Sequence, residues 1–212
     1  MLTLGVDAAR GGWIAVAVED GAFAGAALER RFGALLERFP EAEMIGVDVP
    51  IGLPEPGFRR RADIEARGAL GPRRSSVFFT PSRAALEAPT YAGARAVDAS
   101  TSAQGWALRN AILDVDGTTD ERVREVHPEV SFTELAGGPL PFAKRTWNGH
   151  RARLALLRRA GIRIPDRLDA GLVAADDVLD AAVCAWTATR IARGEHGTLP
   201  GDPMIGEPVI HF

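Results

Sequence analysis

The sequence is poor in several residue types, and each shortage excludes a class of protein. Among its 212 residues there is one cysteine, Cys184, so the chain forms no internal disulfide and no cysteine-rich zinc site. No apolar run approaches the roughly 18 residues of a membrane-spanning helix. Residues 1–7 lack the basic start and cleavage site of a secretory signal. We therefore expect a cytoplasmic protein that does not enter a membrane.

Lysine is almost absent as well, because Lys144 is the only lysine among 25 basic residues. Abundant arginine, alanine and glycine are typical of a GC-rich genome, so arginine alone is weak evidence for nucleic-acid binding. The net charge of −3 points to no particular partner. A local basic patch can still bind phosphate in such a protein.

The remaining composition is that of a globular protein, with 46% hydrophobic and 25% charged residues. The length suits one large domain or two very small ones, and we predict a single domain over residues 1–212. Residues 50–98 contain six prolines and little apolar periodicity. We interpret them as a helical and irregular elaboration of that domain, with short helices near 60–69 and 82–88.

The order of the apolar patterns predicts an α/β fold with a mixed sheet. Short apolar runs predict five strands, over residues 2–7, 13–19, 22–28, 44–49 and 123–127. The first three are expected to form an antiparallel meander, and the others to add parallel strands. Apolar residues at helical spacing predict flanking helices over 31–39, 100–115, 148–160 and 171–193. A capping box predicts a further helical start at Ser131, and the tail 198–212 is expected to be irregular or an edge strand.

Carboxylates inside apolar segments are the main chemical signal. Asp7 and Asp48 each end a predicted strand, and each completes the tripeptide Gly-Val-Asp. A buried charge is unfavourable unless a cation, commonly a metal, compensates it. If the two strands are parallel neighbours, both carboxylates emerge at the carboxyl end of the sheet, where α/β proteins bind ligands. The alternative is that each is an ordinary turn or cap residue.

A third acidic group lies in the last predicted helix. Asp177 and Asp180 are three residues apart and share a face, whereas the apolar stripe of the helix favours Asp176 beside Asp180. The alternative is a solvated, acidic helix start. Glu129 follows the fifth predicted strand and is either a further ligand or a cap. We interpret its neighbour His127 as structural rather than as a general base.

Oxygen ligands without cysteine suit hard divalent ions, so Mg²⁺ or Mn²⁺ is the expected cofactor. Two such ions about 3.5–4 Å apart promote phosphodiester hydrolysis by activating water and stabilising the leaving oxygen. The predicted catalytic residues are Asp7, Asp48, Asp177 and Asp180. The same four residues and Glu129 are the predicted metal ligands.

Two basic and aromatic segments are candidates for binding substrate phosphate. Residues 58–74 contain six arginines and two acids, and a second segment, Lys-Arg-Thr-Trp, begins at Lys144. In both cases the alternative is a solvated surface. No nucleophile motif surrounds the serines after Arg74. The predicted substrate-binding residues are Arg74, Ser75 and Lys144.

Five motifs, spread over about residues 3–194, resemble those of one family. They are Gly5-Val6-Asp7 with Gly11-Gly12-Trp13, Asp48-Val49-Pro50-Ile51-Gly52-Leu53-Pro54, Arg73-Arg74-Ser75-Ser76-Val77-Phe78, His127-Pro128-Glu129-Val130-Ser131-Phe132 and Asp177-Val178-Leu179-Asp180-Ala181. Together they resemble the domain of unknown function 429 family, which is predicted to contain ribonuclease H-like nucleases. The last motif is also similar to the final helix of Holliday-junction resolvases, and it favours Asp177 over Asp176. Resolvases of this fold usually carry glutamate at the position of Asp48.

The resemblance implies a ribonuclease H-like fold and a divalent-metal-dependent nuclease that acts on RNA or DNA. In this reading Asp7 bridges two ions, Asp48 and Asp180 each hold one, and Asp177 and Glu129 complete the shell. A non-catalytic binding or regulatory protein of the same fold is the main alternative. A sugar-kinase- or actin-like phosphotransferase shares the core but normally needs two copies of it. The sequence leaves the oligomeric state open.

Overall fold

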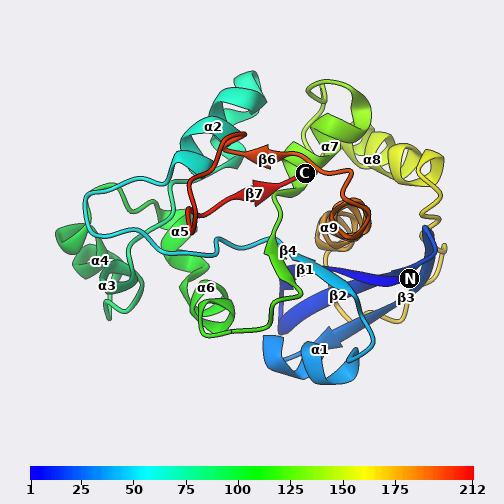
Figure 1. Ribbon diagram of the computed structural model, residues 1–212, viewed down its shortest axis with the longest axis horizontal. Helices are drawn as coiled ribbons and strands as arrows, with labels where there is room; N and C mark the ends of the chain where they lie inside the picture. Colours follow the sequence, from blue (N-terminus) through cyan, green and yellow to red (C-terminus); the bar gives the residue numbers. More distant parts are fainter.

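A five-stranded mixed sheet organises the computed structural model, which describes residues 1–212 (Figure 1). The strands are β1 (Leu2–Ala9), β2 (Gly12–Glu19), β3 (Ala22–Glu29), β4 (Met44–Val47) and β5 (Val123–Glu125). Their order in the sheet is β3-β2-β1-β4-β5. The first three strands form an antiparallel meander, and β4 and β5 run parallel to β1. This confirms the predicted α/β class and the ribonuclease H-like arrangement.

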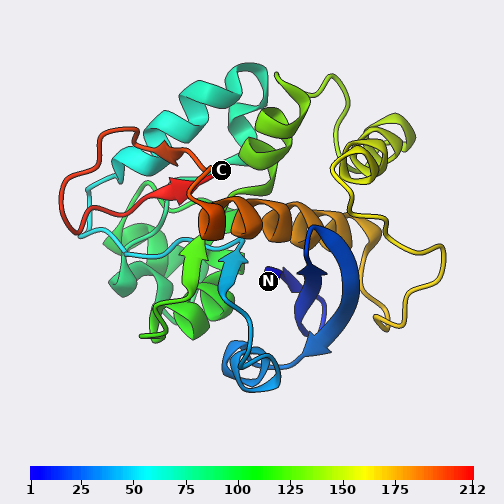
Figure 2. The same ribbon diagram turned by 45° about the vertical axis from the view of Figure 1, so that its right-hand side comes forward.

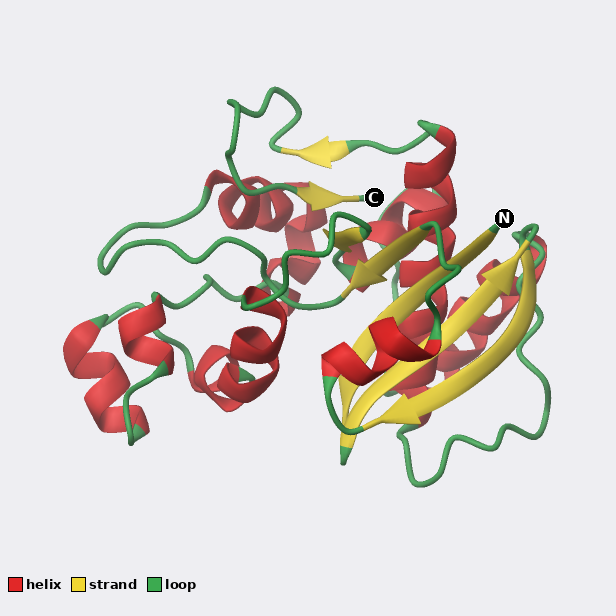
Figure 3. Cartoon of the chain, turned by 60° about the horizontal axis from the view of Figure 1, so that its bottom comes forward, coloured by secondary structure: helices red, strands yellow, loops and turns green.

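Helices cover both faces of the sheet (Figure 3). They are α1 (Phe32–Arg38), α2 (Arg61–Leu70), α3 (Arg83–Leu86), α4 (Tyr91–Val97), α5 (Ala103–Ala107), α6 (Arg109–Asp116), α7 (Pro128–Ala136), α8 (Trp147–Arg159) and α9 (Ala175–Arg193). A 3₁₀ helix, η1 (Gly71–Ser76), follows α2. Two further strands, β6 (Thr198–Leu199) and β7 (Ile210–His211), pair antiparallel. None of the helices combines the length and hydropathy that crossing a bilayer requires.

Strand β2 shows why the sheet is buried on both sides. Its alternate residues enter two different cores because successive side chains of a strand point to opposite faces. Trp13 and Ala15 pack in a cluster with Phe32 of α1, whereas Ile14 and Val16 pack in a cluster with residues of α9. A strand with both faces covered is apolar along nearly its whole length. This is the pattern that the sequence of β2 shows.

Two glycines allow α9 to lie very close to the sheet (Figure 2). Gly5 of β1 is the register partner of Gly46 of β4. A Cβ atom on Gly5 would overlap the backbone of Ala181, and one on Gly46 would lie 2.8 Å from the carbonyl oxygen of Cys184. The two Gly-Val-Asp tripeptides therefore stand side by side under the helix. Because residues i and i+2 of a strand share a face, the aspartate of each tripeptide also faces α9.

A buried ion network fixes the chain that leaves β4. The guanidinium of Arg60 pairs with Asp63 and with Glu125 at the end of β5, at 2.6 Å in each case. It also donates to the carbonyl of Ile51, whose own N–H donates to Glu125. Helix α2 and the segment before it are thereby attached to the same sheet end at which Asp48 lies.

Several predicted boundaries are wrong, and each has a local reason. The single helix predicted over 100–115 is two helices, α5 and α6, which are separated at Leu108. Helix α7 begins at Pro128 and not at Ser131, because proline fits the first helical position. The Ser131 hydroxyl instead accepts a hydrogen bond from Thr187 of α9. Helix α9 begins at Ala175 rather than at residue 171, and α4 was not predicted.

Candidate functional site

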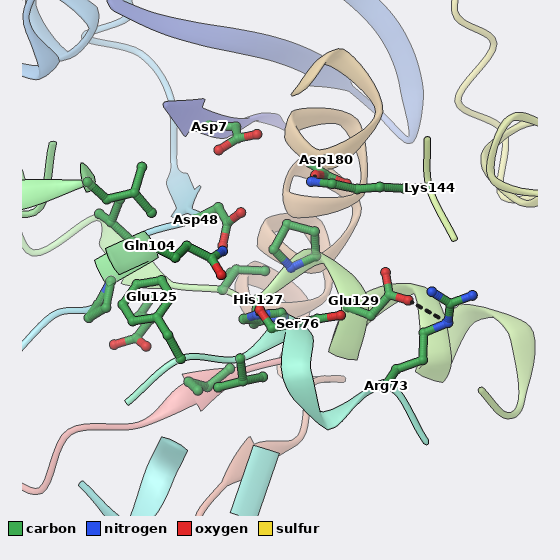
Figure 4. A pocket seen from close by; sticks show the side chains of 18 of the residues that line it. Asp7, Asp48, Arg73, Ser76, Gln104, Glu125, His127, Glu129, Lys144 and Asp180 are labelled. Carbon is green, nitrogen blue, oxygen red and sulfur yellow. Dashed lines mark hydrogen bonds and ion pairs between the residues drawn. The ribbon is translucent and has the colours of Figure 1, made fainter. Parts of the chain in front are cut away.

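Three carboxylates from separate elements meet at the carboxyl end of β1 and β4. Asp7 belongs to β1, Asp48 follows β4 directly, and Asp180 lies in the second turn of α9. One carboxylate oxygen from each lies within 4.8 Å of the others (Figure 4). The N–H of Asp48 donates to the carbonyl of Val6 at 2.9 Å, which continues the parallel pairing and holds Asp48 beside Asp7. We call these three residues the acidic cluster.

The acidic cluster is electrostatically unfavourable in the protein alone. Burial, followed by the charges of Asp48 and Asp180, holds the pKa of Asp7 well above its usual range. Burial also raises the pKa of Asp48 and of Asp180 to about 7, although Lys144 opposes this. The carboxylates of Asp7 and Asp48 accept no hydrogen bond from the protein. The cluster therefore favours either protons or a bound cation.

Lys144 is the one cationic side chain that contacts the acidic cluster. It lies between α7 and α8, and its Nζ forms an ion pair with Asp180. Burial works against the charge of Lys144, but the attraction of Asp180, Asp48 and Asp7 outweighs it and raises the pKa of the lysine. One lysine balances one of three carboxylates, so the fully ionised cluster keeps a charge of −2. A divalent cation matches that remainder.

The other buried acids beside the pocket are already compensated. Glu129, a predicted metal ligand, lies in the first turn of α7 and pairs with Arg153 at 2.6 Å and Arg73 at 3.4 Å. Glu125 pairs with Arg60 in the network described above. The carboxylate oxygens of Glu129 and Glu125 lie outside the acidic cluster. The structure therefore places Glu129 on the wall of the pocket, with arginines as its partners.

The acids at the start of α9 have different neighbours. The carboxylate of Asp176 forms an ion pair with Arg145 at 3.2 Å. Asp177 is half-buried in the first turn of α9, and its charge contributes to raising the pKa of Asp7 and Asp48. Its oxygens lie outside the acidic cluster. Of the two predicted residues of this motif, Asp177 and Asp180, Asp180 is thus the one that converges with the strand aspartates.

The acidic cluster opens into a pocket of about 310 Å³. Arg73, Ser76, Gln104 and His127 line it together with Lys144 (Figure 4). The predicted residues Arg74 and Ser75 are exposed and lie outside this lining. The difference follows from the 3₁₀ helix η1, because residues three apart in such a helix lie on the same side. Arg73 and Ser76 have this spacing and both face the pocket.

His127 and Gln104 contribute neutral polar groups to the pocket wall. The Nε2–H of His127 donates to the Ser76 carbonyl at 3.3 Å, and burial lowers the pKa of the histidine, which favours the neutral ring. Its Nδ1 has no partner in the protein. Gln104 of α5 extends into the pocket toward Asp48 (Figure 4). No sequence signal pointed to Gln104, since it lies in a segment whose pattern predicts one continuous helix.

The fold and the acidic cluster define an α/β protein of ribonuclease H-like arrangement with a candidate metal site at the ends of its parallel strands. The chain belongs to the family described as "Protein of unknown function (DUF429)", which matches residues 5–205. This confirms the family that the motifs predicted. No curated protein and no solved structure matches the chain. The family description names no activity.

Proposed function

We propose that the protein is a divalent-metal-dependent nuclease. The observation that supports this most directly is the convergence of Asp7, Asp48 and Asp180, which together offer three oxygen ligands and have one lysine as their only cationic partner. Carboxylate oxygens are the ligands that Mg²⁺ and Mn²⁺ prefer. Two of the three carboxylates accept no hydrogen bond from the protein, so their oxygens are free to coordinate an ion. The residues present therefore fit the cofactor.

The position of each residue suggests its role. Asp7 adjoins both other members of the acidic cluster, because β1 pairs with β4 and packs against α9, so it would hold an ion together with either of them. Asp48 and Asp180 would each hold one ion, with Asp177 nearby in the first turn of α9. When bound, such ions activate a water and neutralise charge on the oxygens of a scissile phosphate.

Basic side chains on the pocket wall supply the complement to a phosphodiester. Lys144, Arg73 and Arg145 line the pocket that contains the acidic cluster. A substrate phosphate that approaches the cluster would attract the Lys144 ammonium away from Asp180 and so free a carboxylate oxygen. The pocket volume of about 310 Å³ lies at the lower end of the usual range for small-molecule sites and admits part of a nucleotide. RNA and DNA are both candidate substrates.

Calorimetric titration with Mn²⁺ and a cleavage assay test this function together. We expect wild type to bind Mn²⁺ and to cleave labelled RNA or DNA only in its presence. Asp7→Asn should abolish both, whereas Asp166→Asn, which changes an exposed acid, should retain both. Cleavage at the wild-type rate by Asp7→Asn would disprove the proposal. So would a wild type that neither binds Mn²⁺ nor cleaves any form of nucleic acid.

A further inference from the structure

All the charged side chains of one segment beside the pocket are basic. Residues 135–165 contain seven basic residues and no acidic residue, although the whole chain has a net charge of −3. Three of the seven have carboxylate partners: Lys144 with Asp180, Arg145 with Asp176, and Arg153 with Glu129. The other four are exposed and form no ion pair: Arg151, Arg158, Arg159 and Arg163. Their charges are available to a partner molecule.

Helix α8 presents part of this charge along one face. Trp147, Arg151 and Arg158 are separated by four and seven residues, so they project from the same side of the helix. The Trp147 side chain is 75% exposed, and the Arg151 guanidinium lies 5.7 Å from the centre of its ring. The opposite side of α8 is packed in the core through Leu156 and Leu157. The helix is therefore held in place while its basic face points outward.

A groove continues this face. It has a volume of about 600 Å³ and is lined by Arg158, Arg159 and Arg163 over a floor that includes Leu140. Arg73, which lines the pocket of the acidic cluster, donates its Nε–H to the Leu140 carbonyl at 2.9 Å. The groove and the pocket therefore adjoin at this contact.

We propose that this surface binds the unpaired strand of a polynucleotide next to the phosphodiester in the pocket. The surface, which we call the α8 basic surface, comprises Trp147, Arg151, Arg158, Arg159 and Arg163. Its role as a substrate-binding surface rests on the proposed nuclease function. The exposed tryptophan supplies a platform for stacking a base, and stacking needs a base that is not paired in a duplex. The arginines supply positive charge for the phosphates on either side.

The length of α8 and the burial of its apolar side are both consistent with a bound nucleic-acid strand. From Trp147 to Arg159 the helix rises about 18 Å, which is the length of several nucleotides. An anionic membrane would be the other polyanion to consider. Binding there would require an apolar helix face free to enter the bilayer, but the leucines of α8 are occupied in the core. Charge complementarity and the exposed Trp147 ring therefore favour a nucleic-acid strand.

Fluorescence anisotropy with labelled 20-nucleotide oligo(U) and oligo(dT) tests the α8 basic surface. The full chain is used in EDTA, so that no cleavage occurs and no metal is needed. We expect Trp147→Ala and Arg158→Glu each to weaken binding of the preferred oligonucleotide about tenfold. Two matched controls should stay within about twofold of wild type: Leu172→Ala, which removes another exposed apolar side chain, and Arg193→Glu, which reverses an unpaired charge at the end of α9.

Other outcomes would overturn the inference. These are a blunt duplex that binds as tightly as the single strand, anionic phosphatidylserine vesicles that bind in preference to both, or variants of Trp147 and Arg158 that bind like wild type. Hydrolysis of bis(p-nitrophenyl) phosphate by wild type with Mn²⁺ tests the acidic cluster separately, because this small diester does not extend to α8. If the protein binds a single strand through Trp147 but hydrolyses neither substrate, the nuclease proposal is disproved and the binding surface is still supported.

Discussion

Gly5 lies directly against the backbone of Ala181, and this contact sets the distance between α9 and the sheet. Asp7 follows Gly5 by two residues on the same strand face, and Asp180 precedes Ala181 in the helix. The close approach of two backbones therefore brings two carboxylates together. Any side chain at position 5 would push the helix away and separate the members of the acidic cluster.

Gly5→Ala should thus damage both stability and metal binding. Because a Cβ there meets backbone atoms of Ala181 and Ala185, which cannot rotate aside, we expect a loss of about 3 kcal/mol in the free energy of unfolding. That corresponds to a fall of roughly 6–12 °C in Tm. Thermal unfolding and Mn²⁺ calorimetry measure the two effects. Gly25→Ala in β3 is the control, since an added Cβ there meets nothing within 4 Å. Equal Tm values for the two variants would contradict this account.

The acidic cluster should make stability depend on pH in the absence of metal. The folded-state pKa of Asp48 and of Asp180 is about 7, above the value near 3.9 expected in the unfolded chain. A carboxyl whose pKa is raised by folding stabilises the folded state fully below the unfolded pKa, and this contribution is lost as the pH rises through the folded pKa. Stability from the cluster is therefore present at pH 4 and is lost by about pH 8.

Asp7→Asn isolates this effect from that of other titrating groups. In EDTA we expect the variant to unfold at a higher temperature than wild type at pH 8, and the difference to shrink toward pH 5. Mn²⁺ should raise the Tm of wild type at pH 8 but not that of the variant, because metal binding and protonation compete for the same oxygens. A difference that is constant from pH 5 to pH 8 would contradict a pKa near 7 for Asp48 and Asp180.

Lys144→Gln tests whether the lysine competes with a metal ion. Its removal leaves three carboxylates without a cationic partner, so we expect lower stability in EDTA at pH 8 and tighter Mn²⁺ binding than in wild type. Cleavage should nevertheless decrease, because the charge that meets the substrate phosphate is gone. Calorimetry and a cleavage assay at saturating Mn²⁺ measure the two effects. Loss of Mn²⁺ binding in this variant would indicate that Lys144 supports the cluster rather than competing with the ion.

Arg153 should be more important for stability than its place on an amphipathic helix suggests. It is fully buried and pairs with Glu129. It also donates to the carbonyl of Phe142, which precedes α8, and to that of Gly149 in the first turn of α8. Arg153→Met leaves the Glu129 carboxylate buried beside Arg73 alone, and we expect a loss of about 3–5 kcal/mol. Urea unfolding measures it. The double variant Glu129→Gln with Arg153→Met should recover part of the loss, and a purely additive double variant would show that the two side chains are not coupled.

The strands and the strand-end aspartates could be predicted because their signals are local. Apolar runs define the sheet, and the repeated Gly-Val-Asp tripeptide marks both the helix contact and the positions of Asp7 and Asp48. Asp180 could be found from its spacing and its motif. These residues converge because the parallel register pairs Gly5 with Gly46. The repeated tripeptide in the sequence predicts this pairing.

The partners of the other acids could not be predicted because they come from distant segments. Glu129 looked like a ligand, but Arg153, 24 residues away, compensates it. The sequence motif predicted Arg74 and Ser75 as substrate-binding residues. The 3₁₀ helix η1 instead directs Arg73 and Ser76 into the pocket. A one-residue difference of this kind depends on backbone geometry, which composition does not reveal.

Because the chain has a single lysine, chemical modification of lysine reports on this site alone. Lys144 carries the only side-chain amine of the chain, and that amine is held protonated by Asp180. An amine-reactive reagent attacks the neutral form, so the modification rate of this one residue reports how strongly the carboxylate holds it. An ion or ligand that binds the Asp180 carboxylate breaks its ion pair with Lys144 and makes the lysine amine more reactive. Peptide mass spectrometry could then follow occupancy of the pocket through a single modified position.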